Sequence, residues 1–243
     1  MRILAIDTSG QQAGAAIFDS YIGVLVGEVS FNARTGEKSW THSEILMPAI
    51  DQLFQLSGTD MQNIDYVAYT NGPGSFTGLR IGASTALGLA SGLGRPSIPV
   101  PTLDALAYNM LGMANGGVIV PMMDARRGQV YSAIYRIGEN GTIARETEYL
   151  ASSVEDILKM VESERDVFFL GDGTCAYKES IVTTLPHATF LPPNNNRQRA
   201  SSVALCAINQ ITTGFTPTDK VEILYIRAPQ AIQDLANRAS KST

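Results

Sequence analysis

Apolar residues in the first part of the chain change their spacing once, and the change separates strands from a helix. Three apolar runs, at residues 2–6, 13–18 and 21–31, follow one another across turn residues, which predicts an antiparallel meander of strands. Between residues 45 and 56 the apolar side chains recur at helical spacing instead. We therefore expect an amphipathic helix here, in which Pro48 is tolerated because it lies near the start.

The alternation of strands and helices continues to residue 212. A short apolar strand at 66–70 and a helix of small residues at 82–94 precede three prolines between residues 96 and 101. The later pattern predicts helices at residues 103–111, 154–161 and 201–212. It also predicts two paired strands at 118–123 and 129–136 and a further strand at 167–170. The polar tail after residue 231 is expected to fray. The pattern as a whole indicates an α/β protein of two lobes, residues 1–101 and 102–243, with room for part of the C-terminal region to return to the first lobe.

Composition and charge narrow the class of protein. A length of 243 residues with 44% hydrophobic residues is ample for a buried core, and the net charge of -5 argues against a broad basic surface that binds nucleic acid unaided. Cys175 and Cys206 stand outside any metal-ligand or redox motif, so we expect two reduced and mostly buried thiols in a cytoplasmic protein. The N-terminus turns polar too early for a secretory signal, and no stretch approaches the about 20 apolar residues of a membrane span.

A first candidate for phosphate chemistry follows the first predicted strand. Asp7, Thr8 and Ser9 lie where the N–H groups of a turn can face a phosphate or a metal-bound water. The alternative is that these polar side chains only satisfy the hydrogen bonds of their own turn.

A second candidate is the loop at residues 71–82, with the sequence NGPGSFTGLRIG, which joins a predicted strand to a predicted helix. Gly74 and Gly78 permit a close backbone approach, and Ser75 and Thr77 offer hydroxyls at the start of the helix. No Lys-Ser or Lys-Thr pair follows the glycines, so the loop is not a Walker loop, and its spacing does not match the dinucleotide fingerprint. It is suited to an anion or to tight packing against another backbone.

Five segments together resemble the TsaB (YeaZ-like) family over nearly the whole chain: ILAIDTS, GPGSFTGLRIG, PMMDARRGQVY, GDG and LYIRAP. The resemblance implies the two-lobed actin/sugar-kinase/Hsp70-like (ribonuclease H-like) fold. It also implies a role in making threonylcarbamoyladenosine at position 37 of tRNAs that read codons beginning with A. The implied partners are homologues of the catalytic paralogue TsaD and of the ATPase TsaE, with tRNA reached through the complex, no membrane, and a homodimer when the chain is isolated. No cofactor is implied for the chain alone, and ATP or ADP is left to the complex.

The histidines indicate that the chain is not the catalytic member of such a complex. The resemblance implies a pair of metal-binding histidines one helical turn apart in the catalytic paralogue, but His42 has Leu46 four residues later and His187 lies far along the chain. We therefore expect no catalytic residue and no metal site, and a role for His42 in capping or decorating its helix.

Two further polar segments lie in the second half of the chain. Arg126 and Arg127 stand where related phosphotransferases carry a glycine-rich phosphate turn, and their bulk disfavours the same backbone approach. Both arginines remain candidates to contact phosphate, tRNA or a partner carboxylate, with solvated or lobe-bridging roles as the alternative. The Gly171-Asp172-Gly173 segment corresponds in order to an adenosine-binding turn, although ordinary turn chemistry is favoured.

Apolar positions on the first two predicted helices are candidate contacts with a partner, since the resemblance implies that the first lobe docks on TsaD and forms the homodimer. These positions are Ile45, Leu46, Ala49, Leu53, Ala83 and Leu87. The alternative is that they fill the core of the chain itself.

Three functions therefore compete. The first is a non-catalytic subunit that supports TsaD in transferring a threonylcarbamoyl group to adenosine 37 of tRNA. The second is an independent ATP-dependent phosphotransferase of the sugar-kinase type, suggested by Asp7 and the two-lobed pattern. The third, a metalloprotease, needs metal ligands that the sequence does not supply.

Overall fold

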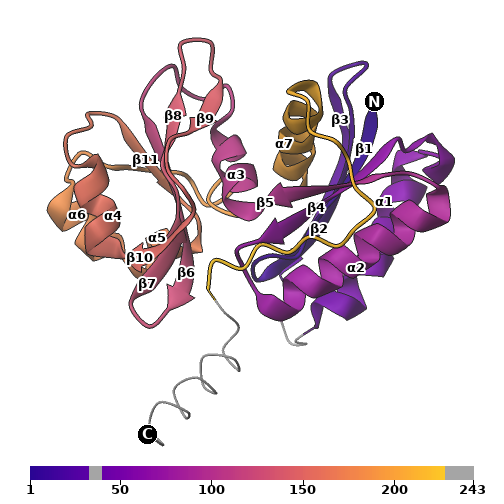
Figure 1. Ribbon diagram of the computed structural model, residues 1–243, viewed down its shortest axis with the longest axis horizontal. Coiled ribbons are helices and arrows are strands. Elements are labelled where there is room, and N and C mark those ends of the chain that lie inside the picture. The colour runs from indigo at the N-terminus through magenta and orange to yellow at the C-terminus, as the bar shows by residue number, and fades with distance from the viewer. Residues whose placement is uncertain (33–39, 228–243) are drawn as a thin grey trace, which may run out of the picture.

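The first lobe is built on a five-stranded sheet with the strand order β3-β2-β1-β4-β5. The computed structural model describes residues 1–32 and 40–227. Strands β1 to β3 form the expected antiparallel meander, while β4 and β5 run parallel to β1 (Figure 1). The strand bounds are β1 (Arg2–Asp7), β2 (Gln12–Asp19), β3 (Val24–Asn32), β4 (Tyr66–Gly72) and β5 (Ser97–Pro101).

Helices cover both faces of this sheet, so β1 is buried on both sides. Leu4 and Ile6 point into a core formed with α1 (His42–Ser57) and α2 (Phe76–Leu93). Ile3 and Ala5 alternate to the other face, where α7 (Ala200–Thr212) packs (Figure 1). A helix from the end of the chain therefore completes the first lobe.

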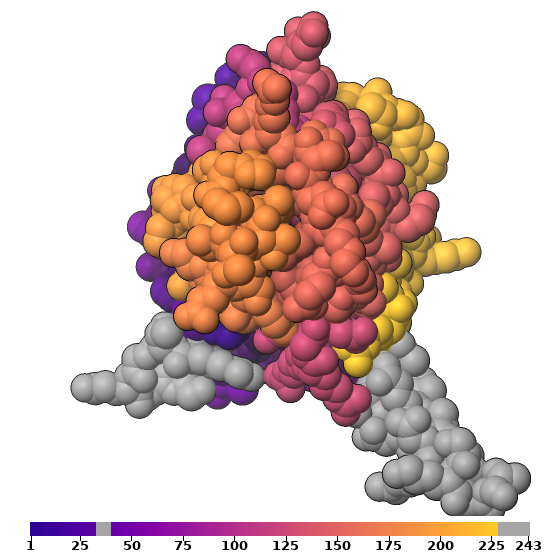
Figure 2. All heavy atoms as spheres, turned by 90° about the vertical axis from the view of Figure 1, so that its left-hand side faces the viewer, coloured from indigo at the N-terminus to yellow at the C-terminus, as the bar shows by residue number. Residues whose placement is uncertain are grey.

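The second lobe holds a seven-stranded sheet with the order β10-β7-β6-β11-β12, and with β8 pairing to β6 and β9. Helices α4 and α6 cover one face of it, seen from outside in Figure 2, and α3 packs on the other. The strand bounds are β6 (Val118–Arg126), β7 (Gln129–Ser132), β8 (Tyr135–Ile137), β9 (Ile143–Arg145), β10 (Leu150–Ser153), β11 (Val167–Leu170) and β12 (Thr189–Phe190). The helix bounds are α3 (Thr102–Ala107), α4 (Val154–Val161), α5 (Asp172–Ala176) and α6 (Lys178–Thr184), and short 3-10 turns occupy Met61–Asn63 and Tyr108–Met110.

Most predicted elements lie where expected, but two element boundaries and the position of Pro48 within its helix differ. Helix α2 begins at Phe76 rather than at residue 82, because the Ser75 hydroxyl accepts the N–H of Gly78 and caps it. The strand expected at 129–136 is divided into β7 and β8, which pair with different parts of β6. Pro48 lies inside α1, beyond its first turn, so the expectation that it lies near the start is wrong.

The two thiols differ in their surroundings. Cys206 lies on α7 and is buried against the sheet, where burial raises its pKa well above the usual thiol range, whereas Cys175 on α5 is exposed. The expectation of mostly buried thiols is therefore wrong for Cys175. Among residues 1–32 and 40–227, no helix is long and apolar enough to cross a membrane. The tail predicted to fray after residue 231 lies outside the described residues.

Candidate functional site

Asp7, Thr8 and Ser9 are buried where β1 ends, and the donors of Ser9 form hydrogen bonds within this turn. Oδ1 of Asp7 accepts both the N–H and the hydroxyl of Ser9, each at 2.8 Å, while Oδ2 is buried without a hydrogen bond. Burial raises the pKa of Asp7 to about 6, against the opposite effect of the two bonds from Ser9. The Ser9 donors that an incoming phosphate would need are thus already taken by Asp7.

The glycine-rich loop packs directly on this turn. The Thr8 hydroxyl donates to the carbonyl oxygen of Gly78 at 2.8 Å, and the N–H of Ser75 donates to the carbonyl oxygen of Ser9 at 2.7 Å. A Cβ added at Gly78 would collide with the carbonyl oxygen of Thr8, and one at Gly74 with that of Ser9. These glycines therefore allow one backbone to lie against another.

The structure thus brings together most of the residues that the sequence singled out for phosphate chemistry. Asp7, Thr8 and Ser9 meet the loop at Gly74, Ser75 and Gly78. Thr77 stays apart from them, exposed on the first turn of α2.

Four further polar side chains lie near this junction, and only Asn71 falls within a segment that the sequence singled out. Thr70 and Asn71 end β4, and Thr102 follows β5, so their side chains lie at the same edge of the sheet as Asp7. Each of these three side chains has a buried oxygen without a hydrogen bond. The amide nitrogen of Gln198 is also buried without a hydrogen bond. The position of a polar residue at the carboxyl end of a parallel strand is a signal that could have identified Thr70 and Thr102. Gln198, which packs on Gly10, comes from a distant loop and left no such signal.

The turn between β6 and β7 is exposed, unlike the buried residues at the end of β1. Arg126, Arg127 and Gly128 all adopt positive φ, at 62°, 57° and 73°, and all three are exposed. The N–H of Arg126 donates to Oδ1 of Asp124 at 2.7 Å, so this carboxylate binds the main chain rather than a guanidinium. Within the described residues neither arginine forms an ion pair.

Residues 221–227, named here the C-terminal strap, connect the two lobes. The N–H of Leu224 donates to the carbonyl oxygen of Asn71 at 2.8 Å, and a Cβ added at Gly72 would collide with the carbonyl oxygen of Leu224. At its far end Arg227 donates to the carbonyl oxygen of Ala125 at 3.1 Å. The strap therefore runs from the glycine-rich loop to the β6–β7 turn, as its thin yellow path in Figure 1 shows.

Four of the six apolar positions proposed for a partner are unavailable to one. They are buried to 6% exposure or less in the core beneath α1 and α2: Leu46, Ala49, Leu53 and Ala83. The prediction is wrong for these four residues because they lie on the inward face of each helix, and this apolar face covers the sheet. Ile45 and Leu87 are partly exposed, and Met47 on the outer side of α1 is 47% exposed.

The histidines do not cap helices. Thr41 is the N-cap of α1, and its N–H donates to the carboxylate of Glu44 at 2.7 Å. Nε2 of His42 lies 3.1 Å from the carbonyl oxygen of Gly10, so this ring ties α1 to the β1–β2 turn. His187 forms a bond to the carbonyl oxygen of Glu164. No group of three His, Cys, Asp or Glu side chains in the described part of the chain is arranged to hold a metal ion.

The Gly171-Asp172-Gly173 turn serves packing. Its first N–H donates to Oδ1 of Asn196 at 2.8 Å, and a Cβ added at Gly171 would collide with the carbonyl oxygen of Met122. The glycine is therefore required where α5 approaches β6.

A chain with two lobes, each built on a mixed β-sheet with helices on both faces, has the fold of actin-like proteins and sugar kinases. The ROK hexokinase from Thermus thermophilus superimposes with a TM-score of 0.50 at 11% identity, covering 87% of this chain and 100% of that one. The expected fold class is confirmed.

Closer relatives define the family. YeaZ from Pseudomonas aeruginosa superimposes with a TM-score of 0.73 at 22% identity, covering 93% of this chain and 99% of that one. The tRNA threonylcarbamoyladenosine biosynthesis protein TsaB of Bacillus subtilis is 35% identical over 79% of this chain and 80% of its own length, and that of Haemophilus influenzae is 29% identical over 80% and 81%. A family model described as TsaD, tRNA N6-adenosine threonylcarbamoyltransferase, matches residues 36–233. The chain belongs to the TsaB (YeaZ) family.

Proposed function

We propose that this protein is a non-catalytic subunit of a tRNA-modifying complex, which supports a TsaD-type partner in transferring a threonylcarbamoyl group to adenosine 37 of tRNA. The names of its relatives support a place in threonylcarbamoyladenosine biosynthesis. The partners are then homologues of TsaD and TsaE in the cytoplasm, tRNA is reached through the complex, and any ATP or ADP belongs to the assembled complex.

The observation that supports the non-catalytic role is that the chain itself occupies the hydrogen-bond donors and the space at the turn after β1. A phosphotransferase of this fold needs free N–H donors at this turn to hold a phosphate. Here the Ser9 donors bind Asp7, and the loop at Gly74 and Gly78 packs on the carbonyl oxygens of the same turn. The residues present therefore do not fit a nucleotide phosphate, and the independent phosphotransferase loses its main support.

The outer side of α1 and α2 is the surface to which we assign the partner, and the homodimer of the isolated chain. A Cβ added at Gly88 or Gly92 meets no atom within 4 Å, so this part of α2 lets another helix approach closely. Met47 on α1, which lies beside α2 in Figure 1, adds an exposed apolar side chain. This surface is called the α1/α2 docking face below.

A reconstituted transfer assay tests the role directly. We expect no threonylcarbamoyl transfer by this chain alone, and rapid transfer only when it is added to its TsaD-type and TsaE-type partners. Turnover by the isolated chain, or full activity of the partners without it, would contradict the proposal.

A pair of arginine substitutions tests the α1/α2 docking face. Gly88→Arg places a long charged side chain where a partner helix must approach, so the partner should bind at least about tenfold more weakly. Met160→Arg is the matched control, because Met160 is 48% exposed on α4 of the other lobe. Equal partner affinities of the two variants in a titration would place the interface elsewhere.

A further inference from the structure

A hollow of about 420 Å³ lies between α2 and the C-terminal strap. It is lined by Arg80, Ser84, Val221, Ile223 and Tyr225, and so contains an aromatic ring, two aliphatic side chains and a guanidinium but no carboxylate. The established family and the proposed function leave this hollow without a ligand.

Aromatic and cationic groups are held together at the mouth of the hollow. The rings of Phe76 and Tyr225 lie 5.7 Å apart, and each side chain is 40% exposed. The guanidinium of Arg80 lies 3.9 Å from the centre of the Phe76 ring and donates to the Tyr225 hydroxyl at 3.2 Å. Two exposed rings that an arginine holds in place form a stacking platform for a third flat, aromatic group.

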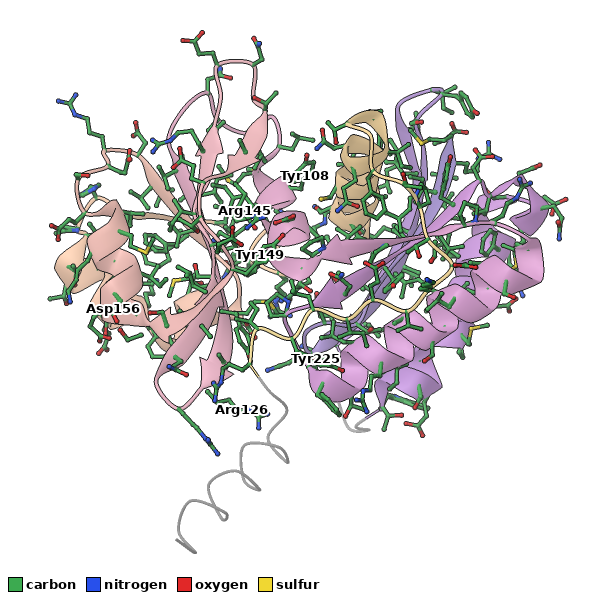
Figure 3. The ribbon with its side chains drawn as sticks, viewed as in Figure 1. Tyr108, Arg126, Arg145, Tyr149, Asp156 and Tyr225 are labelled. Atoms are coloured by element: carbon green, nitrogen blue, oxygen red, sulfur yellow. The ribbon has the colours of Figure 1, made fainter. Side chains whose placement is uncertain are left out.

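Arginines continue from this platform along the strap. Arg227 follows Tyr225 by two residues and binds the carbonyl oxygen of Ala125, next to the exposed Arg126 and Arg127. Figure 3 shows Tyr225 and Arg126 on the same edge of the molecule, where the two lobes meet. The nearest carboxylate of the turn, Asp124, accepts a main-chain N–H, and that of Glu222 on the strap forms no ion pair within the described residues. The guanidiniums therefore keep their charge available to an anion.

We propose that this edge binds the RNA substrate, with an unstacked base in the hollow against Tyr225 and neighbouring phosphates on Arg126 and Arg127. The alternation of a flat apolar platform with cations matches a nucleic acid strand, in which bases alternate with phosphates. The chain as a whole has a net charge of -5, so its surface is not basic in general. The arginines without ion pairs therefore distinguish this edge as the place where RNA would bind. This inference rests on the proposed function, and α2 carries both the hollow and the docking face, so bound RNA lies beside the catalytic partner.

Two variants separate the phosphate contacts from the base contact. In the double variant Arg126→Asn with Arg127→Asn, both charges are lost, and asparagine tolerates positive φ better than most residues. Binding of an unmodified tRNA transcript to the complex is measured by fluorescence anisotropy over a range of salt concentrations. We expect the slope of log affinity against log salt to fall by about 1.4, since each single-strand phosphate contact contributes about 0.7.

Tyr225→Leu keeps an apolar side chain but removes the ring. Affinity for tRNA should fall about tenfold with the salt slope unchanged, because stacking releases no counterions. The matched control is Arg165→Asn with Lys178→Asn, two exposed cations on the second lobe away from the strap, which should leave affinity and slope unaltered.

The outcomes distinguish this inference from the proposed function. If the wild-type chain stimulates transfer but the variants bind tRNA as it does, the RNA site is wrong and the proposed function stands. If the variants lose affinity for the partner protein instead, the edge is a protein contact and the inference is overturned. If the wild-type chain fails to stimulate transfer at all, the proposed function itself fails.

Discussion

The β1–β2 turn of the first lobe and the β6–β7 turn of the second follow the leading strand of their sheets, yet they are built in opposite ways. Thr8 and Ser9 of the first turn are buried beneath a glycine-rich loop, which has no side chain at its closest contacts with them, Gly74 and Gly78. The second is exposed, and it carries Arg126 and Arg127 at positive φ, where glycine would be less strained. The first turn therefore packs against its own chain, whereas the arginine side chains of the second turn are exposed to solvent.

This difference separates residues that stabilise the protein from residues that face its partners. In the first turn the Ser9 donors bind Asp7, which is the basis of the proposed non-catalytic role. A strained turn whose cations have no ion pair among the described residues points outward, toward an anion.

The largest effect is expected where the loop meets the first turn. Gly78→Ala should lower the free energy of unfolding by roughly 3 kcal/mol, because its Cβ collides with the rigid carbonyl oxygen of Thr8. Gly92→Ala on the same helix is the control, since its Cβ meets no atom within 4 Å, and it should raise stability by about 0.5–1 kcal/mol. Urea denaturation of both variants measures the difference. Equal effects would show that the loop does not press on Thr8.

A second effect concerns the buried carboxyl of Asp7. Its pKa is about 6 in the folded chain and about 3.8 when unfolded, so the folded state binds the proton more tightly and loses stability as pH rises from about 4 to about 6. Asp7→Asn keeps the Oδ1 acceptor for Ser9 and removes the charge. It should therefore raise the free energy of unfolding at pH 7 by roughly 2–3 kcal/mol and flatten this part of the pH dependence.

Asp19, which pairs with Arg2 at the other end of the same hairpin, provides the control for that measurement. Its hydrogen bonds with Arg2 lower the pKa of Asp19, so its contribution to stability is present at neutral pH and is lost as pH falls. Asp19→Asn should thus weaken the protein at pH 7, the opposite sign to Asp7→Asn. A stability curve that Asp7→Asn leaves unchanged would mean that Asp7 titrates normally.

The smallest effect is expected in the second turn. Arg127→Gly relieves a φ of 57° and should raise the free energy of unfolding by about 0.5–1 kcal/mol, after the greater freedom of glycine in the unfolded chain is counted. Arg165→Gly, at an exposed arginine without positive φ, should lower it slightly. Thermal or urea unfolding that ranks the two variants the other way would contradict the strain assigned to this turn.

The sequence by itself determined the alternation of strands and helices, the glycine-rich strand-to-helix loop at residues 71–82 and the lack of a histidine pair one helical turn apart. These features are local, because spacing within a few residues sets the exposed and buried faces of each element. Helix α4 and strand β11, for example, lie at the expected residues.

Only the tertiary structure decided which residues meet across long separations. It directed Leu46 and Ala83 into the core rather than toward a partner, and it placed Gln198 on Gly10. It also laid the strap across Asn71 and brought Arg227 to the β6–β7 turn. Periodicity shows that a helix face is apolar but not what covers it, and a segment such as the strap, held by main-chain bonds to distant residues, leaves no pattern in its own sequence.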